Sequence, residues 1–166
     1  MPSLTDPSIG LKSFQSELAW GRIKIDRCRW QKELFMHLDF PTGDKGDPRY
    51  TYVSLDEKKS VKAMVIMAVA EPLHGRPCFG IGYAVPEKYR GNGYAKDAVA
   101  AALREFRSGM KNARVSNFYV EAIVGKDNAP SNAVALATIA KDRTEVTDSL
   151  SKTPCYRYEL ASSDIP

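Results

Sequence analysis

The chain has 166 residues, of which 43% are hydrophobic and 27% are charged, and it carries a net charge of +4. A chain of this length and composition can bury a core without disulfide or metal support, so we expect one domain over residues 1–166. The three cysteines are odd in number and far apart, which predicts neither a disulfide framework nor a zinc site and favours a reducing, cytoplasmic location.

Neither secretion nor membrane insertion is expected. The longest apolar run, residues 63–70, has only eight residues and is too short to span a bilayer. Residues 1–10 contain proline and aspartate but no apolar core of a signal peptide.

The first 40 residues alternate between apolar and basic side chains. This pattern predicts one or two helices, interrupted near Gly21. Ile23 and Ile25 alternate with polar residues, so a short strand there stays open. We interpret Trp20 and Trp30 as core residues, and stacking of either one on a cationic amine stays open as the alternative. His37 lies on the same apolar helical pattern, so we interpret it as a packed histidine.

Three strands are predicted next, over residues 50–55, 63–70 and 79–85. An exposed loop rich in proline, glycine and aspartate precedes them at residues 39–48. A turn at residues 72–77 should join the second strand to the third. A meander of strands that leads into a helix indicates a mixed α/β fold.

A glycine-rich turn follows the third strand. Pro86 has no N–H for a sheet, so regular pairing should end there. Gly91 and Gly93 allow a tight turn and close approach of a ligand, and the first N–H groups of the next helix point outward without partners. Together with Arg90 these groups predict a phosphate or pyrophosphate site. An ordinary strand-to-helix connection stays open as the alternative.

Two other phosphate motifs do not fit the turn. A P-loop needs a lysine followed by serine or threonine after its last glycine, where Tyr94 and Ala95 stand here. A dinucleotide fingerprint needs a third glycine at the position of Lys96. The helix that follows has one apolar stripe, formed by Ala95, Val99, Ala102, Leu103 and Phe106.

Positive charge is concentrated around this turn. Residues 61–115 contain nine Lys or Arg against four Asp or Glu, whereas residues 1–60 have ten against nine and residues 116–166 have five against seven. This charge suits the phosphates of a ligand, although an ordinary solvated surface stays open. Nucleic acid is disfavoured, because no basic stripe is interleaved with exposed aromatic residues.

The C-terminal part predicts a further strand, a helix and a hairpin. The strand covers residues 119–124, and Asn128 opens the helix. Residues 145–150 and 156–160 should form the hairpin, which leaves residues 162–163 as a loose end.

The pattern Arg-x-x-Gly-x-Ala, from Arg90 to Ala95, resembles the acyl-CoA-binding motif of the GNAT N-acetyltransferase superfamily. The later strand and Asn-x-x-Ser helix are also similar to that family. The resemblance covers residues 49–141, and residues 82–86 look most like the branch that includes ribosomal-protein-alanine acetyltransferases. It implies the GNAT fold, a central mixed, mostly antiparallel sheet flanked by helices.

The resemblance also implies an activity and its partners. The protein would be an acetyl-CoA-dependent N-acetyltransferase that acts directly on a primary amine of a small molecule or protein, without a metal, nucleic acid or membrane. A homodimer stays open. The residues implied to hold acetyl-CoA are Tyr83, Ala84 and Val85 for the pantetheine arm, Arg90, Gly91, Asn92, Gly93, Tyr94 and Ala95 for the pyrophosphate, and Asn128 and Ser131 for the end of the pantetheine.

The catalytic acid and base are less defined. Many relatives carry a tyrosine acid seven residues after the position of Asn128, where this chain has Ala135, so Tyr156, Tyr158 or water would replace it. Glu121 is the predicted base because it resembles a carboxylate of some relatives; a water-facing or arginine-paired side chain is its alternative. Asn128 as a simple helix cap also stays open. A non-catalytic acyl-CoA-binding module and a nucleic-acid-binding interaction protein are the competing functions.

Overall fold

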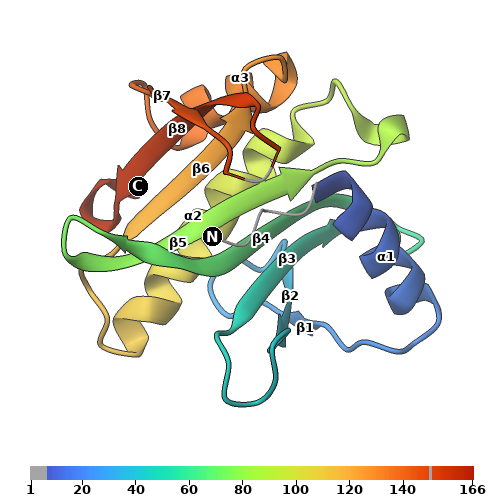
Figure 1. Cartoon of the computed structure of the whole chain (residues 1–166). Helices are drawn as coiled ribbons and strands as arrows, with labels where there is room; N and C mark the ends of the chain where they lie inside the picture. Colours follow the sequence, from blue (N-terminus) through green and yellow to red (C-terminus); the bar gives the residue numbers. More distant parts are fainter. Residues whose placement is uncertain (1–6, 150) are drawn as a thin grey trace.

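The computed structural model describes residues 7–149 and 151–166, and within them the chain forms one eight-stranded sheet in the order β1-β2-β3-β4-β5-β6-β8-β7. The sheet runs through the centre of the molecule (Figure 1). Its strands are β1 (Asp26–Arg27), β2 (Phe35–Asp39), β3 (Arg49–Leu55), β4 (Val61–Leu73), β5 (Arg76–Ala84), β6 (Tyr119–Gly125), β7 (Thr144–Thr147) and β8 (Pro154–Ala161).

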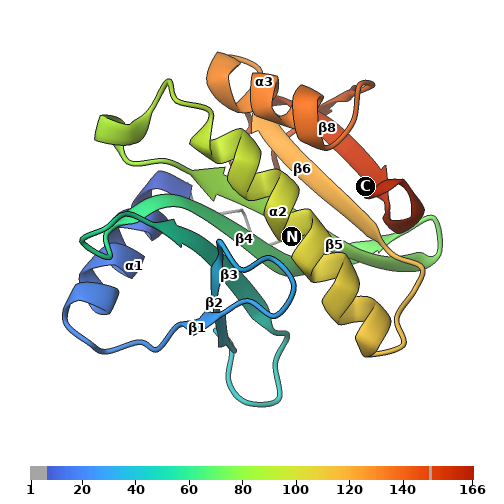
Figure 2. The same cartoon turned by 180° about the vertical axis from the view of Figure 1, so that it is seen from behind.

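Helices cover both faces of the sheet. One face carries α1, whereas α2 and α3 lie on the other, as the two views in Figure 1 and Figure 2 show. This mixed, mostly antiparallel sheet with flanking helices confirms the predicted fold class. The helices are α1 (Pro7–Ala19), α2 (Tyr94–Asn112) and α3 (Ala129–Thr138), with short 3-10 turns η1 (Glu87–Tyr89) and η2 (Ser162–Asp164).

The pairing of β5 with β6 differs from the other pairings of the sheet. These two strands run parallel, and every other neighbouring pair in the sheet runs antiparallel. A parallel pair needs a crossover connection, and α2 supplies it. The register covers only three pairs, from Cys78↔Tyr119 to Gly80↔Glu121. Beyond Gly80 the two strands no longer pair.

The apolar stripe of α2 fills the core on its face of the sheet. Val99, Ala102 and Leu103 are almost fully buried there. Phe106 packs edge-to-face against Phe79 at 4.8 Å between ring centroids and against Phe118 at 5.5 Å. Such aromatic packing adds to the burial of apolar surface and fixes α2 on β5.

The structure differs from several local predictions. Of the one or two helices expected in the first 40 residues one forms, α1; β1 and β2 follow it, because pairing of β2 with β1 and β3 outweighs the helical pattern. His37 therefore lies on β2, where its Nδ1 is 2.8 Å from the Lys24 carbonyl oxygen. Trp20 and Trp30 are not core residues, since 74% and 40% of their surfaces are exposed.

The two remaining differences concern a turn and the chain end. The β4–β5 turn needs only His74 and Gly75, both with positive φ, as in a tight two-residue hairpin. The expected loose end is ordered as η2: Ser162 is buried, and its hydroxyl donates to the Ser116 carbonyl at 2.9 Å. The first strand of the predicted hairpin is β7, and residue 150 lies outside the described residues.

Glu105 on α2 fastens the loop between β1 and β2. Its buried carboxylate accepts hydrogen bonds from the backbone N–H groups of Arg29, Trp30 and Gln31, at 2.8, 3.0 and 2.9 Å. Burial, followed by the nearby Glu105 carboxylate, raises the pKa of the Cys28 thiol to about 12. That thiol therefore stays protonated at neutral pH. No helix in the described part of the chain is long and apolar enough to cross a membrane.

Replacing Glu105 should remove the hydrogen bonds that hold the β1–β2 loop against α2. We expect Glu105→Ala to lower the free energy of unfolding by about 2 to 3 kcal/mol, because three backbone donors lose a charged acceptor. Urea denaturation measures the change. Glu17→Ala is the control, since the exposed pair of Glu17 with Arg22 should contribute under about 1 kcal/mol. Equal losses in the two variants would contradict the assigned role.

Candidate functional site

The start of α2 is open to a ligand. Gly91 and Gly93 adopt left-handed conformations, with φ of 80° and 77°, and Gly93 is the N-cap residue. A glycine has no side chain with which to cap the helix, and the first backbone bond of α2 runs from Asp97 N–H to the Gly93 carbonyl at 3.1 Å. Among the described residues, no acceptor meets the N–H groups of Tyr94, Ala95 and Lys96. These donors and the helix dipole form an anion site.

Side chains within the turn hold its shape. Arg90 donates through Nε to the Val85 carbonyl at 3.1 Å, and the rest of this exposed side chain faces solvent. Asn92 donates to the carbonyls of Tyr89 and Arg90, at 3.1 and 3.2 Å. The hydroxyl of Tyr89 donates to the carboxylate of Asp56, and this bond lowers the pKa of Asp56. The turn is thereby tied to the β3–β4 connection.

Lys62 is a cation at this site that sequence reasoning missed. It lies on β4, beside the irregular register between β3 and β4 at Ser54 and Leu55. Its Nζ is 4.9 Å from the centroid of the Tyr94 ring, in the first turn of α2. No local motif marks Lys62, because its position depends on sheet pairing and on the crossover. The positive field at the start of α2 therefore comes from two separate parts of the chain.

One edge of β5 is also open beside the turn. Residues 81–84 pair with β4 on one side, but no strand in the described structure pairs with them on the other. Alternate residues of a strand direct their N–H and C=O groups to the same side. Such an edge can bind an extended ligand that has amide groups. We call residues 81–84 the open edge of β5.

Three predicted pantetheine contacts lie at or next to this edge. Tyr83 is buried, and its hydroxyl donates to the Ser131 carbonyl at 2.6 Å, which joins β5 to the first turn of α3. Burial raises the pKa of the Tyr83 phenol. Ala84 packs on the opposite face of the sheet in the cluster with Leu11, whereas Val85 packs against the larger core. Tyr83 thus contributes a side chain, as well as backbone groups, to this region.

Asn128 and Ser131 bind each other. The Asn128 side chain accepts a hydrogen bond from the backbone N–H of Ser131 at 3.2 Å, so Asn128 is the N-cap of α3. This is the helix-cap role that the sequence left open. The capped turn fixes the Ser131 carbonyl that receives the Tyr83 hydroxyl.

Glu121 lies at the last paired position of β5 and β6. It pairs with Gly80 on one side and with Glu159 of β8 on the other. Only 8% of its side chain is exposed, and its carboxylate is 3.4 Å from Nε of Arg157. Burial raises the pKa of Glu121, Arg157 opposes this rise, and Glu159 and Glu71 add to it. A partly desolvated carboxyl at the start of the open edge is suited to accept a proton.

The tyrosines of the tail have other partners. Tyr158 is fully buried, and its hydroxyl donates to Oδ1 of Asn132 at 2.6 Å and accepts from Arg143 at 3.1 Å. The guanidinium of Arg143 also lies over the ring of Tyr156, at 3.7 Å from the centroid. Ala135 is fully buried in the core. These contacts do not identify a residue that replaces the tyrosine acid expected at position 135.

The model of the Acetyltransferase (GNAT) family matches residues 18–136, well over half of the chain. The chain belongs to the GNAT acetyltransferase family. The matched region of this GNAT protein includes the open start of α2, the open edge of β5, Glu121 and the capped turn of α3. No curated protein sequence matches it significantly.

Solved structures share the fold at low sequence identity. A GNAT-family acetyltransferase from Bacillus anthracis is 16% identical, with 70% of this chain and 67% of that one covered and a TM-score of 0.51. An aminoglycoside N(6')-acetyltransferase from Legionella pneumophila is 15% identical, with 74% of this chain and 69% of that one covered and a TM-score of 0.51. A mutant spermidine N-acetyltransferase from Vibrio cholerae is 12% identical, with 70% of this chain and 66% of that one covered and a TM-score of 0.52. These likenesses establish the GNAT fold, and the ribosomal-protein-alanine branch stays a prediction.

Gly93 provides a test of the anion site. An added Cβ would meet no atom within 4 Å, so Gly93→Ala acts through the left-handed backbone alone. We expect about 1 to 2 kcal/mol of strain to disturb the first turn of α2 and to weaken coenzyme A binding about tenfold in calorimetry.

Gly75→Ala is the matched control for Gly93→Ala. Gly75 has φ of 73° and equally empty surroundings, but it lies in the β4–β5 turn. This variant should keep the wild-type affinity for coenzyme A. An unchanged affinity in Gly93→Ala would contradict the assignment of the anion site.

Proposed function

We propose that this GNAT protein transfers the acetyl group of acetyl-CoA directly to a primary amine of a small molecule or protein. The observation that carries the proposal is the uncapped start of α2 directly after a strand with an open edge. One element offers N–H donors to phosphates, and the other offers amide partners to an extended arm. Coenzyme A has both chemical groups, joined in that order.

The donor would lie along these elements in sequence. The N–H groups of Tyr94, Ala95 and Lys96 would bind the pyrophosphate, with Gly91, Asn92 and Gly93 shaping the turn. Arg90 and Lys62 would supply positive charge beside it. The open edge of β5, together with Val85 directly after it, would align the pantetheine through Tyr83, Ala84 and Val85, and Asn128 and Ser131 would meet its end.

The acetyl group would then react near Glu121. The amine nitrogen attacks the thioester carbonyl carbon, a C–N bond forms, and the C–S bond breaks. Glu121 accepts the proton released by the amine, and its raised pKa makes it a stronger base than an ordinary glutamate. The departing thiolate takes a proton from water, since the hydroxyls of Tyr83 and Tyr158 already donate to protein acceptors. The reaction as proposed uses no metal.

A non-catalytic acyl-CoA-binding role is the second candidate. It is favoured by the buried Ala135 and by the engaged hydroxyl of Tyr158. Release of free thiol from acetyl-CoA in the presence of a panel of primary amines separates the two roles. Thiol release that depends on one of the amines supports the transferase. Tight binding of coenzyme A without thiol release from any amine would support the binding module instead.

Glu121→Gln tests the proposed base. The variant keeps the shape of the side chain but cannot accept the proton, so we expect kcat/KM to fall by about 10² to 10⁴ while coenzyme A affinity is kept. In the wild type, the carboxylate form accumulates as pH rises through the raised pKa. The acidic limb of the rate profile should therefore lie above the ordinary range of a glutamate, and it should vanish in Glu121→Gln.

Glu159→Gln is the matched control for the base. Glu159 is the cross-strand neighbour of Glu121 on β8, is more exposed, and interacts with His74 at 3.3 Å. Its replacement should lower the rate less than threefold, on the scale of an exposed ion pair. Equal losses in both variants would remove Glu121 from the base role.

A further inference from the structure

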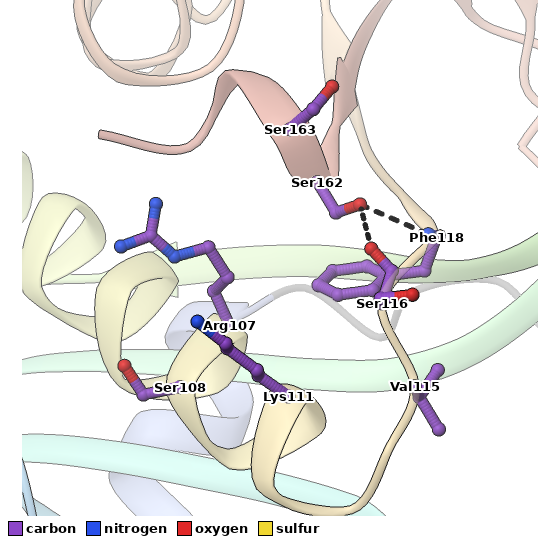
Figure 3. Close-up of a pocket in the computed structure, with 8 residues that line it drawn as sticks. All are labelled: Arg107, Ser108, Lys111, Val115, Ser116, Phe118, Ser162 and Ser163. Carbon is purple, nitrogen blue, oxygen red and sulfur yellow. Dashed lines mark hydrogen bonds between the residues drawn. The ribbon is translucent and has the colours of Figure 1, made fainter.

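A second candidate binding site lies at the opposite end of α2. A pocket of about 490 Å³ lies between the last turns of α2, the connection to β6 and η2, and Figure 3 shows the residues that line it. Arg107 lies 13 residues after Tyr94, which places it about 20 Å along the helix from the anion site at the start of α2. This pocket is therefore separate from the proposed coenzyme A site.

The walls of the pocket are held by hydrogen bonds. Ser162 is buried; its hydroxyl donates to the Ser116 carbonyl at 2.9 Å and accepts from the Phe118 N–H at 3.2 Å. Arg107 donates to the carbonyl of Ile165, a residue that is itself buried. These bonds join η2 to α2 and to the start of β6. The pocket is thus preformed.

The chemistry of the lining favours an anion. Arg107 and Lys111 are one helical turn apart and line the pocket together, and no Asp or Glu side chain is among the lining residues. The bond to Ile165 uses one guanidinium nitrogen of Arg107, which leaves other donors of its fork for a ligand. Ser108 and Ser163 add hydroxyl groups for which the described structure has no hydrogen-bond partner. Phe118 is buried beneath them and supplies an apolar floor.

Stabilisation of the C-terminal end of α2 by cations does not explain why both Arg107 and Lys111 line the pocket. Lys111 lies in the last turn of α2, where a cation offsets the helix dipole without any pocket. Arg107 is farther from the end and donates instead to the carbonyl of Ile165, directly after η2. Two like charges four residues apart repel each other, and an anion between them would relieve that repulsion.

We propose that this pocket binds a small molecule with a phosphate group. A guanidinium fork, an ammonium group and hydroxyls match a phosphate, which has several acceptor oxygens. The volume lies within the range of small-molecule sites and leaves room for an attached group over the apolar floor. The site would work independently of the acetyl transfer proposed above.

Ribose 5-phosphate is a suitable probe, with ribose as its neutral counterpart. We expect the phosphate ester, but not ribose, to shift the backbone NMR signals of Ser108, Lys111 and Ser163 at low ionic strength. Shifts only at Gly91, Gly93 and Tyr94 would mean that phosphate binds the start of α2 alone, and they would overturn the proposal. The absence of any shift up to millimolar ligand would overturn it too.

Two variants test the residues. Lys111→Ala should weaken ribose 5-phosphate about threefold to tenfold at this pocket, the effect of a lost charged donor, and should leave coenzyme A affinity unchanged. Lys12→Ala, which removes an exposed lysine of α1, is the control and should change neither affinity. Arg107→Lys keeps the charge but loses the fork, so it should also weaken binding. Wild-type affinity in both pocket variants would contradict the site.

Discussion

The short parallel pairing of β5 with β6 is the constraint on which the rest of the structure depends. Three residue pairs, ending at Gly80 and Glu121, hold the two parts of the sheet together. A parallel pair requires a crossover, so α2 must start beside the end of β5. Because pairing then stops, the same strand has an open edge next to an open helix start. A single feature of topology thus places phosphate donors and amide partners side by side.

Contacts across the sheet keep this arrangement rigid. The Tyr83 hydroxyl bridges from β5 to α3 at a point where no strand pairing exists, and Asn128 fixes the turn that receives it. The hydroxyl of Tyr158 on β8 donates to Asn132 on α3 and accepts from Arg143. Buried polar groups with satisfied partners specify one packing of the elements. The open edge of β5 is therefore bordered by fixed side chains before any ligand arrives.

Features set by residues close together in the chain could be predicted from the sequence, whereas contacts between distant elements could not. The open helix start follows from glycines and a missing cap in residues 90–95, and the predicted GNAT fold is confirmed. Lys62 and the Tyr83 hydroxyl bond could not be predicted, because each joins elements far apart in the chain. His37 was assigned to a helix because periodicity gives no measure of pairing with β3. Ser162 looked like a loose end because its partners, Ser116 and Phe118, lie more than 40 residues earlier, in the connection between α2 and β6.

The central claim is that coenzyme A binds both the start of α2 and the open edge of β5. Amide hydrogen exchange with and without coenzyme A tests it most directly. The account predicts slower exchange at Tyr94, Ala95 and Lys96 and along residues 81–84, with η2 unchanged. Saturating coenzyme A that protects neither segment, or that protects only other parts of the chain, would contradict the account.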